Sequence, residues 1–165
     1  MVSSSLTLTS TRSPKATGDA YLKFELGRGI QAIFLMKQVQ EVLVLPPHRL
    51  TAMPNMSACL LGLTNRRSRV LWVMDLAKML AIGALDPSPQ QYDLVILRTH
   101  TMSVAVAVRQ VEGILWVAPE TLQPPPIHIA TNLIPYMRGC MVQSQDILLA
   151  LDAEAIVQSP VLQGH

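Results

Sequence analysis

The chain has 165 residues, of which 50% are hydrophobic and 15% are charged, and its formal net charge is +2. This composition excludes a disordered polyelectrolyte, and so small a charge excess argues against a nucleic-acid-binding protein. No apolar run approaches the roughly 18 residues of a membrane span, so direct membrane insertion is not expected.

The two ends of the chain differ in composition from its middle. Residues 1–18 are rich in serine and threonine, contain two basic residues and no acidic one, and lack the apolar segment of a secretory signal. We interpret them as a disordered tail, with a transit peptide as the alternative. Residues 158–165 are interpreted as a second loose end. The ordered region is therefore expected at 19–157.

The first half of this region predicts short strands and one helix. Leu22, Phe24 and Leu26 alternate with charged residues, which is typical of a half-buried strand. The elements that follow are a turn at 27–29, strands at 30–35 and 39–44, a proline-broken segment at 46–56, strands at 60–63 and 70–74, and a helix at 76–81. Strand 70–74 is expected to be buried on both faces, because it is continuously apolar.

The same order recurs after the linker Asp86-Pro87-Ser88-Pro89. Strand-like segments lie at 94–97, 104–108, 111–114, 137–140 and 147–151, with a proline break at 124–126 and a helical segment at 153–157. An offset of 77 residues relates Gly62 to Gly139 and Asp75 to Asp152. The chain is therefore interpreted as two related halves.

Each half is too small to be stable alone, so the two are expected to pack together. Short antiparallel strands avoid exposed edges by closing into small barrels. The fold prediction is all-β, with two packed five-stranded barrels and short helices. The first barrel is placed at about 19–85 and the second at about 90–157.

No arrangement of residues typical of a catalytic or metal site is present. The four histidines share no metal-ligand spacing, and Asp75 and Asp152 are explained more simply as helix caps than as a catalytic pair. Cys59 and Cys140 form no CxxC pair and are interpreted as buried thiols of a cytosolic protein, although a disulfide between them stays open. The sequence predicts no enzyme, cofactor or metal; an enzyme site assembled across the two halves is the weakest alternative.

Arg66, Arg67 and Arg69 form the single basic cluster of the sequence. A phosphate site would need further cationic neighbours, which the chain does not offer. We interpret Arg66 and Arg69 as residues of a solvated polar turn that spans residues 65–69.

Several segments together carry a family resemblance between Tyr21 and Val157. They are Phe24-Glu25-Leu26-Gly27, Val39-Gln40-Glu41-Val42, the proline-rich stretch from Leu45-Pro46-Pro47 to Met53-Pro54, Gly62-Leu63-Thr64-Asn65-Arg66-Arg67 followed by 70–76, Tyr136-Met137-Arg138-Gly139, and 147–156. In this order and spacing they resemble the CheW-like domain, the coupling module of bacterial chemotaxis-type signalling. The chain departs from the family pattern at Ser68, where a glycine is usual, at Trp72, where a proline is usual, and at Arg109, where an aspartate is usual.

The resemblance implies two small five-stranded SH3-like barrels packed face to face and no catalysis. It implies a cytoplasmic adaptor, associated with membrane receptor arrays through its partners, that links chemoreceptors to a CheA-type histidine kinase. The receptor's helical tip would dock between the barrels. The kinase's regulatory domain, which has the same fold, would pair barrel to barrel, and the same pairing implies weak self-association. Because of the three departures, the alternative is a diverged motility regulator that has lost the receptor or the kinase.

Family matching also implies which residues bind partners. Val39 would lie on the receptor side of the groove, with Glu41 and Arg67 beside it, and we hypothesise that these two charges pair. A plain core position is the alternative for Val39. The kinase contact is predicted on the first barrel, around residues 42–45 and 60–63, and it includes Val42 and Leu63.

Overall fold

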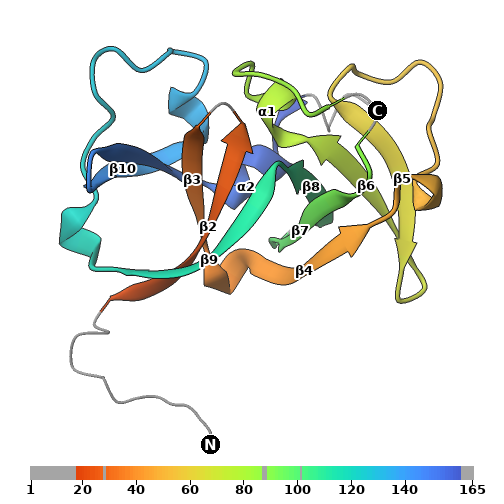
Figure 1. Cartoon of the computed structure of the whole chain (residues 1–165), viewed down its shortest axis with the longest axis horizontal. Helices are drawn as coiled ribbons and strands as arrows, with labels where there is room; N and C mark the ends of the chain where they lie inside the picture. The colour runs from red at the N-terminus through yellow and green to blue at the C-terminus, as the bar shows by residue number, and fades with distance from the viewer. Residues whose placement is uncertain (1–17, 28, 87–88, 101, 161–165) are drawn as a thin grey trace, which may run out of the picture.

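Two five-stranded β-sheets dominate the computed structural model, which describes residues 18–27, 29–86, 89–100 and 102–160. Sheet 1 has the strand order β10-β11-β3-β2-β9, and sheet 2 has the order β4-β7-β8-β6-β5. In Figure 1 the sheets form two lobes that lie side by side, with α1 and α2 near the junction. The predicted all-β fold with two five-stranded units and short helices is confirmed.

The strands of the first repeat are β2 (Asp19–Gly27), β3 (Ile30–Leu35), β4 (Val39–Leu45), β5 (Leu60–Arg66) and β6 (Arg69–Asp75), followed by α1 (Leu76–Met79). Those of the second repeat are β7 (Tyr92–Arg98), β8 (Ser103–Val108), β9 (Gln110–Val117), β10 (Met137–Gln143) and β11 (Asp146–Leu151), followed by α2 (Ala153–Val157). Short 3₁₀ turns lie at Met36–Gln38, Pro47–Arg49, Pro119–Thr121 and Ile134–Tyr136.

The two sheets do not coincide with the two halves of the sequence. Sheet 1 combines the β2–β3 hairpin of the first repeat with β9, β10 and β11 of the second, and sheet 2 has the reciprocal composition. The repeat itself is confirmed, because the two strand orders become identical when corresponding strands are exchanged. The predicted barrel boundaries at 19–85 and 90–157 are wrong. The sequence pattern marks the repeating unit, whereas the parallel pairings of β3 with β11 and of β8 with β6 are formed between repeats.

The largest apolar cluster lies between the sheets and takes residues from both. Phe24 of β2 and Phe34 of β3 stack there at a ring-centroid distance of 5.0 Å. On β7, Val95 contributes to this central cluster, whereas the neighbouring Leu94 contributes to the interior of sheet 2. Strands that are apolar at consecutive positions are therefore buried on both faces, as the continuous runs of the second repeat require. The prediction fails for the start of β6, where Val70 is 66% exposed.

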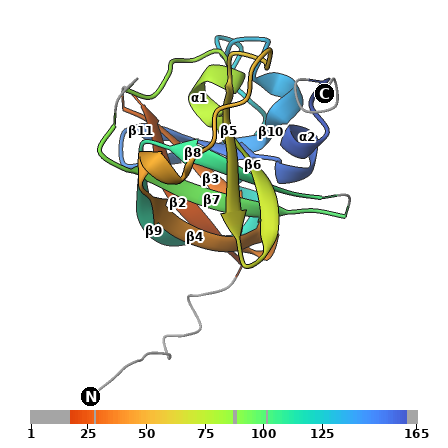
Figure 2. The ribbon, with the colours of Figure 1, turned by 90° about the vertical axis from the view of Figure 1, so that its right-hand side faces the viewer.

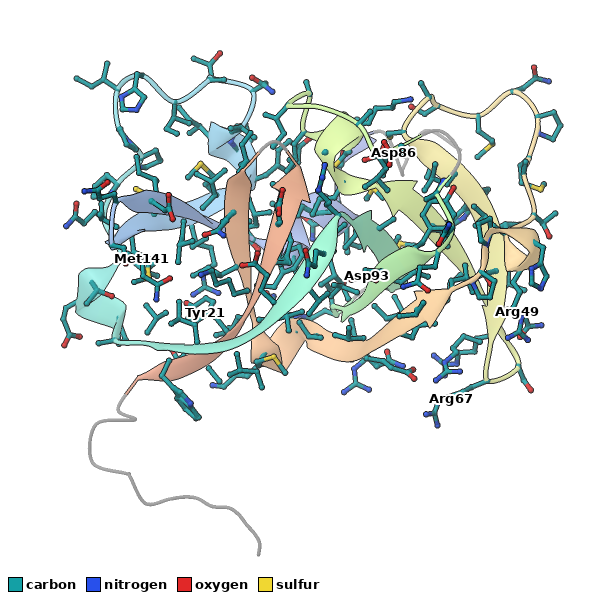
Figure 3. All side chains as sticks on the ribbon, in the orientation of Figure 1. Tyr21, Arg49, Arg67, Asp86, Asp93 and Met141 are labelled. Carbon is teal, nitrogen blue, oxygen red and sulfur yellow. The ribbon has the colours of Figure 1, made fainter. Side chains whose placement is uncertain are left out.

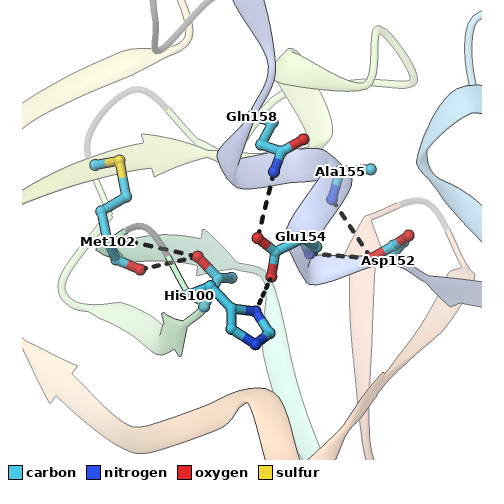
Figure 4. Close-up of polar contacts among 7 residues, drawn as sticks. His100, Met102, Asp152, Glu154, Ala155 and Gln158 are labelled. Carbon is cyan, nitrogen blue, oxygen red and sulfur yellow. Dashed lines mark hydrogen bonds and ion pairs between the residues drawn. The ribbon is translucent and has the colours of Figure 1, made fainter.

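Both predicted aspartate caps are present. The Asp75 carboxylate accepts a hydrogen bond from the backbone N–H of Lys78 at 3.1 Å and another from Leu85 at 2.9 Å. The Asp152 carboxylate accepts from the N–H groups of Glu154 and Ala155 at the start of α2 (Figure 4). Helix α1 ends before the predicted residue 81. Ala81 has a positive φ of 61°, which no right-handed helix accommodates.

Predictions for the chain ends and the cysteines meet different outcomes. The predicted N-terminal tail, apart from Gly18, lies outside the described residues, as do residues 161–165. The predicted C-terminal tail begins too early, because Ser159 is buried and its hydroxyl lies 3.2 Å from that of Tyr136. Cys59 and Cys140 are buried free thiols, and burial raises the pKa of Cys140.

Candidate functional site

Sheet 2 curls until its two edge strands, β4 and β5, approach each other. The segment after β4 forms a β-bridge from Thr51 to Leu63 of β5. The Thr64 hydroxyl also donates a hydrogen bond to the carbonyl oxygen of Arg49 at 3.1 Å. These contacts leave an opening between the edge strands, which we call the β4–β5 mouth. In Figures 1 and 2 strand β5 and the end of β4 lie at the end of the sheet-2 lobe that faces away from sheet 1.

A charged cluster spans the β4–β5 mouth. Glu41 lies on β4, on the face that also carries the half-buried Leu43. Its carboxylate forms an ion pair with Arg66 at the end of β5 and approaches the Arg67 guanidinium at 3.6 Å. The hypothesised pairing of Glu41 with Arg67 is thus present, but Arg66 makes the closer contact. The interpretation of Arg66 as a solvated turn residue is wrong, since Arg66 belongs to β5 and is ion-paired with Glu41; its side chain is 38% exposed, compared with 73% for Arg67.

The sequence contained no local signal for the Arg66 contact. Arg66 is 25 residues from Glu41, and only the curl of the sheet brings the two together. The predicted polar turn over 65–69 is in fact a two-residue connection, so that Asn65 and Arg66 belong to β5 and Arg69 begins β6. Side chains alternate between the faces of a strand, and this alternation directs Arg66 to the same face as the buried Thr64.

The ion pair predicts a specific dependence of stability on pH. The hydrogen bond from Arg66, together with the charges of both arginines, lowers the pKa of Glu41 below the ordinary value of 4.5. A carboxylate with a depressed pKa stabilises the folded state fully above about pH 4.5, and this contribution is lost as the pH falls through the folded-state pKa. Urea unfolding between pH 6 and pH 3 should therefore show a steeper loss of stability in the wild type than in Glu41→Gln. If the stability of the two proteins changed with pH in the same way, the ion pair would not contribute to this pH dependence.

The connection between β5 and β6 places Arg67 at the tip of a tight hairpin. Arg67 and Ser68 both have positive φ, 53° and 65°, which is the conformation of a type I′ turn. Ser68 therefore retains the turn that a glycine would form without strain.

Replacing Ser68 with glycine should increase the free energy of unfolding by about 0.5–1 kcal/mol. The glycine removes the left-handed strain of the serine, and the greater flexibility of the unfolded glycine chain offsets part of this gain. Urea titration of Ser68→Gly measures the difference, and Ser68→Ala, which keeps the strain, is the matched control. Equal stabilities of the glycine and alanine variants would show that the turn is not strained.

The other predicted site residues lie around this cluster, but not within it. Val42 and Val44 lie on the opposite face of β4, and they are 41% and 53% exposed. Leu63 is half-buried on β5 and is paired with Trp72 of β6. Val39 is half-buried and packs against the central apolar cluster between the sheets. The core alternative for Val39 therefore agrees with its packing, and its role in binding stays a prediction.

A cavity of about 520 Å³ opens at the β4–β5 mouth. Its apolar wall is formed by Leu43, Val44, Leu45, Leu71, Leu94 and Ile96, and its polar rim by Arg49, Thr64, Asn65, Arg66 and Arg67. Figure 3 shows that Arg49 and Arg67 lie at the same end of the sheet-2 lobe, far from Tyr21 and Met141 in the sheet-1 lobe. None of the described residues that line the cavity is acidic.

A second concavity, of about 380 Å³, lies where elements of both sheets meet. It is lined by Leu35, Lys37, Gln38, Arg98, Thr99, His100 and Glu154. The Nδ1 atom of His100 lies 3.6 Å from Glu154 of α2, and Gln158 donates a hydrogen bond to the same carboxylate (Figure 4). Val39 follows Gln38 directly, so the position predicted to face the receptor lies beside this concavity.

The described part of the chain was also compared with the requirements of a metal site and of a membrane-spanning helix. Among those residues, no group of three or more histidine, cysteine, aspartate or glutamate side chains is placed to hold a metal ion. Within the same residues, no helix has the length and apolar character needed to cross a membrane.

Comparison with known proteins gives consistent matches. Residues 20–161 match the CheW-like domain family. The chain is 31% identical over 107 residues to a probable chemotaxis protein CheW of Rhizobium etli, a region that covers 64% of this chain and 68% of that protein. Its structure is similar to that of the scaffolding protein TtCheW from Thermoanaerobacter tengcongensis, with a TM-score of 0.70. That match covers 82% of this chain and 90% of the other at 19% identity, and it therefore bears on the fold alone.

Proposed function

Since the chain belongs to the CheW-like domain family, we propose that it is a non-catalytic scaffold that couples chemoreceptors to a CheA-type histidine kinase in the cytoplasm. The curated relative is a probable chemotaxis protein, and the structural relative is a scaffolding protein. The observation that carries the proposal is the family match together with two separate concavities, one at the β4–β5 mouth and one between the sheets.

The kinase contact is assigned to the open edge of sheet 2. Strand β4 is an edge strand, so one row of its backbone groups has no strand partner among the described residues. Its outward side chains Val42 and Val44 are apolar and exposed, although isolated exposed valines are common on protein surfaces. Exposed apolar side chains on an unpaired edge are features that a second barrel of the same fold can cover.

The receptor contact is assigned to the concavity between the sheets. A helical tip needs an apolar surface with a few fixed polar groups. Leu35 and the stems of Lys37 and Arg98 offer such a surface, and the adjacent Val39 continues it.

None of the family departures favours the alternative of a diverged regulator. Ser68 keeps the type I′ turn, and Trp72 packs against the central cluster. Arg109 is an exposed residue paired with Glu25 at 3.4 Å, in the other lobe. None of these three residues lines either of the two concavities.

Calorimetric titration against the regulatory domain of a CheA-type kinase and against a receptor tip fragment tests the proposal. We expect micromolar binding of both partners. Val39→Ala should weaken receptor binding, and Val44→Asp should weaken kinase binding, each leaving the other partner unaffected. Binding of neither partner by folded protein would overturn the proposal, and binding of only one would favour the diverged regulator.

A further inference from the structure

The internal repeat provides a control for the charged rim of the β4–β5 mouth. Arg66 ends β5 as Gln143 ends β10, and Arg67 occupies the turn position that Ser144 has in the second repeat. Both turn residues have a positive φ, 53° and 57°. Arg49 and Thr121 likewise end corresponding 3₁₀ turns. The second repeat thus builds the same hairpin with neutral residues at the positions of Arg66 and Arg67, so the hairpin does not require these two arginines.

Within the described part of the chain, the arginines that line the cavity also exceed their counter-charge. Three guanidinium groups line the cavity, and Glu41 is the carboxylate that neutralises part of this charge. Arg66 and Arg67 converge on the same oxygen of that carboxylate, Oε2. Two guanidinium groups directed at one oxygen form a carboxylate clamp, which an internal carboxylate already occupies.

The surroundings of the clamp suit an extended peptide. The unpaired edge of β4 runs along the mouth, and an extended segment can add to such an edge through its backbone. Alternate side chains of an added strand would face the apolar wall at Leu43 and the exposed Val44. A net charge of about +2 at the rim, three arginines less Glu41, favours an acidic occupant.

We propose that the β4–β5 mouth binds an extended acidic segment of a partner protein, whose carboxylates take over the clamp of Arg66 and Arg67 from Glu41. The inference rests on the proposed scaffold function and adds to it the chemistry of the docking segment, in which acidic residues alternate with aliphatic ones. Glu41 competes with the segment for the clamp. Removing Glu41 should therefore strengthen binding, whereas removing the arginines should weaken it.

A peptide titration tests the site without any natural partner. The probe is a blocked pentapeptide of alternating valine and glutamate, and the same peptide with glutamine in place of glutamate is the neutral control. Binding is followed by NMR of the full chain. The acidic peptide should shift the backbone amide signals of Arg49 and residues 64–67, and added salt should weaken binding. Equal shifts with both peptides, or shifts confined to another surface, would overturn the inference.

Three variants distinguish the clamp from general electrostatics. The double variant Arg66→Gln, Arg67→Ser copies the second repeat and should weaken binding of the acidic peptide about tenfold. Arg69→Gln removes one charge from the same hairpin but none from the cavity lining, and it should change the affinity less than about twofold. Glu41→Gln should increase the affinity about threefold or more. A decrease with Glu41→Gln, or equal losses for all arginine variants, would refute the exchange at the clamp.

The same variants, titrated with the kinase regulatory domain, separate this inference from the proposed function. If the wild type and the double variant bind the domain equally well, the acidic-segment inference is wrong while the scaffold function stands. If the wild type does not bind the domain, but the peptide results are as expected, the scaffold assignment fails and the acidic-segment site remains.

Discussion

Replacing Gly62 with alanine is expected to lower the free energy of unfolding by roughly 4 kcal/mol. Gly62 has a φ of +145°, a backbone conformation that residues with a Cβ rarely adopt. A Cβ at this position would lie 2.3 Å from the carbonyl oxygen of Thr51, which is closer than any van der Waals contact allows. Because the obstacle is backbone, it can be relieved only by moving the chain that bridges to Leu63.

Urea and thermal unfolding measure this effect, and alanine variants of two other glycines serve as comparisons. Gly139, the repeat equivalent, would place a Cβ 2.9 Å from the Gln123 carbonyl oxygen, so its alanine variant should lose less stability. Gly83 also has a positive φ, but no atom of the described residues lies within 4 Å of the added carbon. Gly83→Ala should therefore show the strain alone, about 1–2 kcal/mol. If Gly83→Ala were as damaging as Gly62→Ala, the close approach to Thr51 would not be the cause.

Replacing Phe24 with alanine should cost about 3–5 kcal/mol, equivalent to a fall in Tm of roughly 10 °C. Its ring is fully buried and stacks on Phe34 in the cluster shared by both sheets. The cavity left by the ring would be lined from both sheets, since Met74 of sheet 2 belongs to the same cluster. Phe24→Leu, which keeps most of the volume, should lose considerably less.

The same variant tests whether the two sheets unfold together. Each sheet contains one of the two tryptophans, Trp72 in β6 and Trp116 in β9. Fluorescence of the single-tryptophan proteins Trp72→Phe and Trp116→Phe therefore reports on each sheet separately. Because each sheet combines strands of both repeats, we expect the two sheets to unfold in coincident transitions. Phe24→Ala should shift both transitions equally. Transitions at different temperatures would show that the central cluster does not couple the sheets.

Local features of the chain could be predicted where local physics fixes them. The alternation at Leu22, Phe24 and Leu26 identified β2, and the aspartates before α1 and α2 identified the two caps. The charge pair of Glu41 with Arg67 was found through the family resemblance. The closer contact of Glu41 with Arg66 was missed, since it depends on how far sheet 2 curls.

The sequence by itself determined the strands, the turns, the caps and the twofold repeat of this protein, because hydrophobic periodicity and turn residues act over a few positions. Only the tertiary structure decided which hairpin joins which sheet, because a strand's own residues do not specify its neighbour when several partners offer the same apolar face. The parallel pairs β3–β11 and β6–β8 are such choices. The charged mouth likewise exists only after β4 and β5, the two edges of sheet 2, have been brought together by the curl of the sheet.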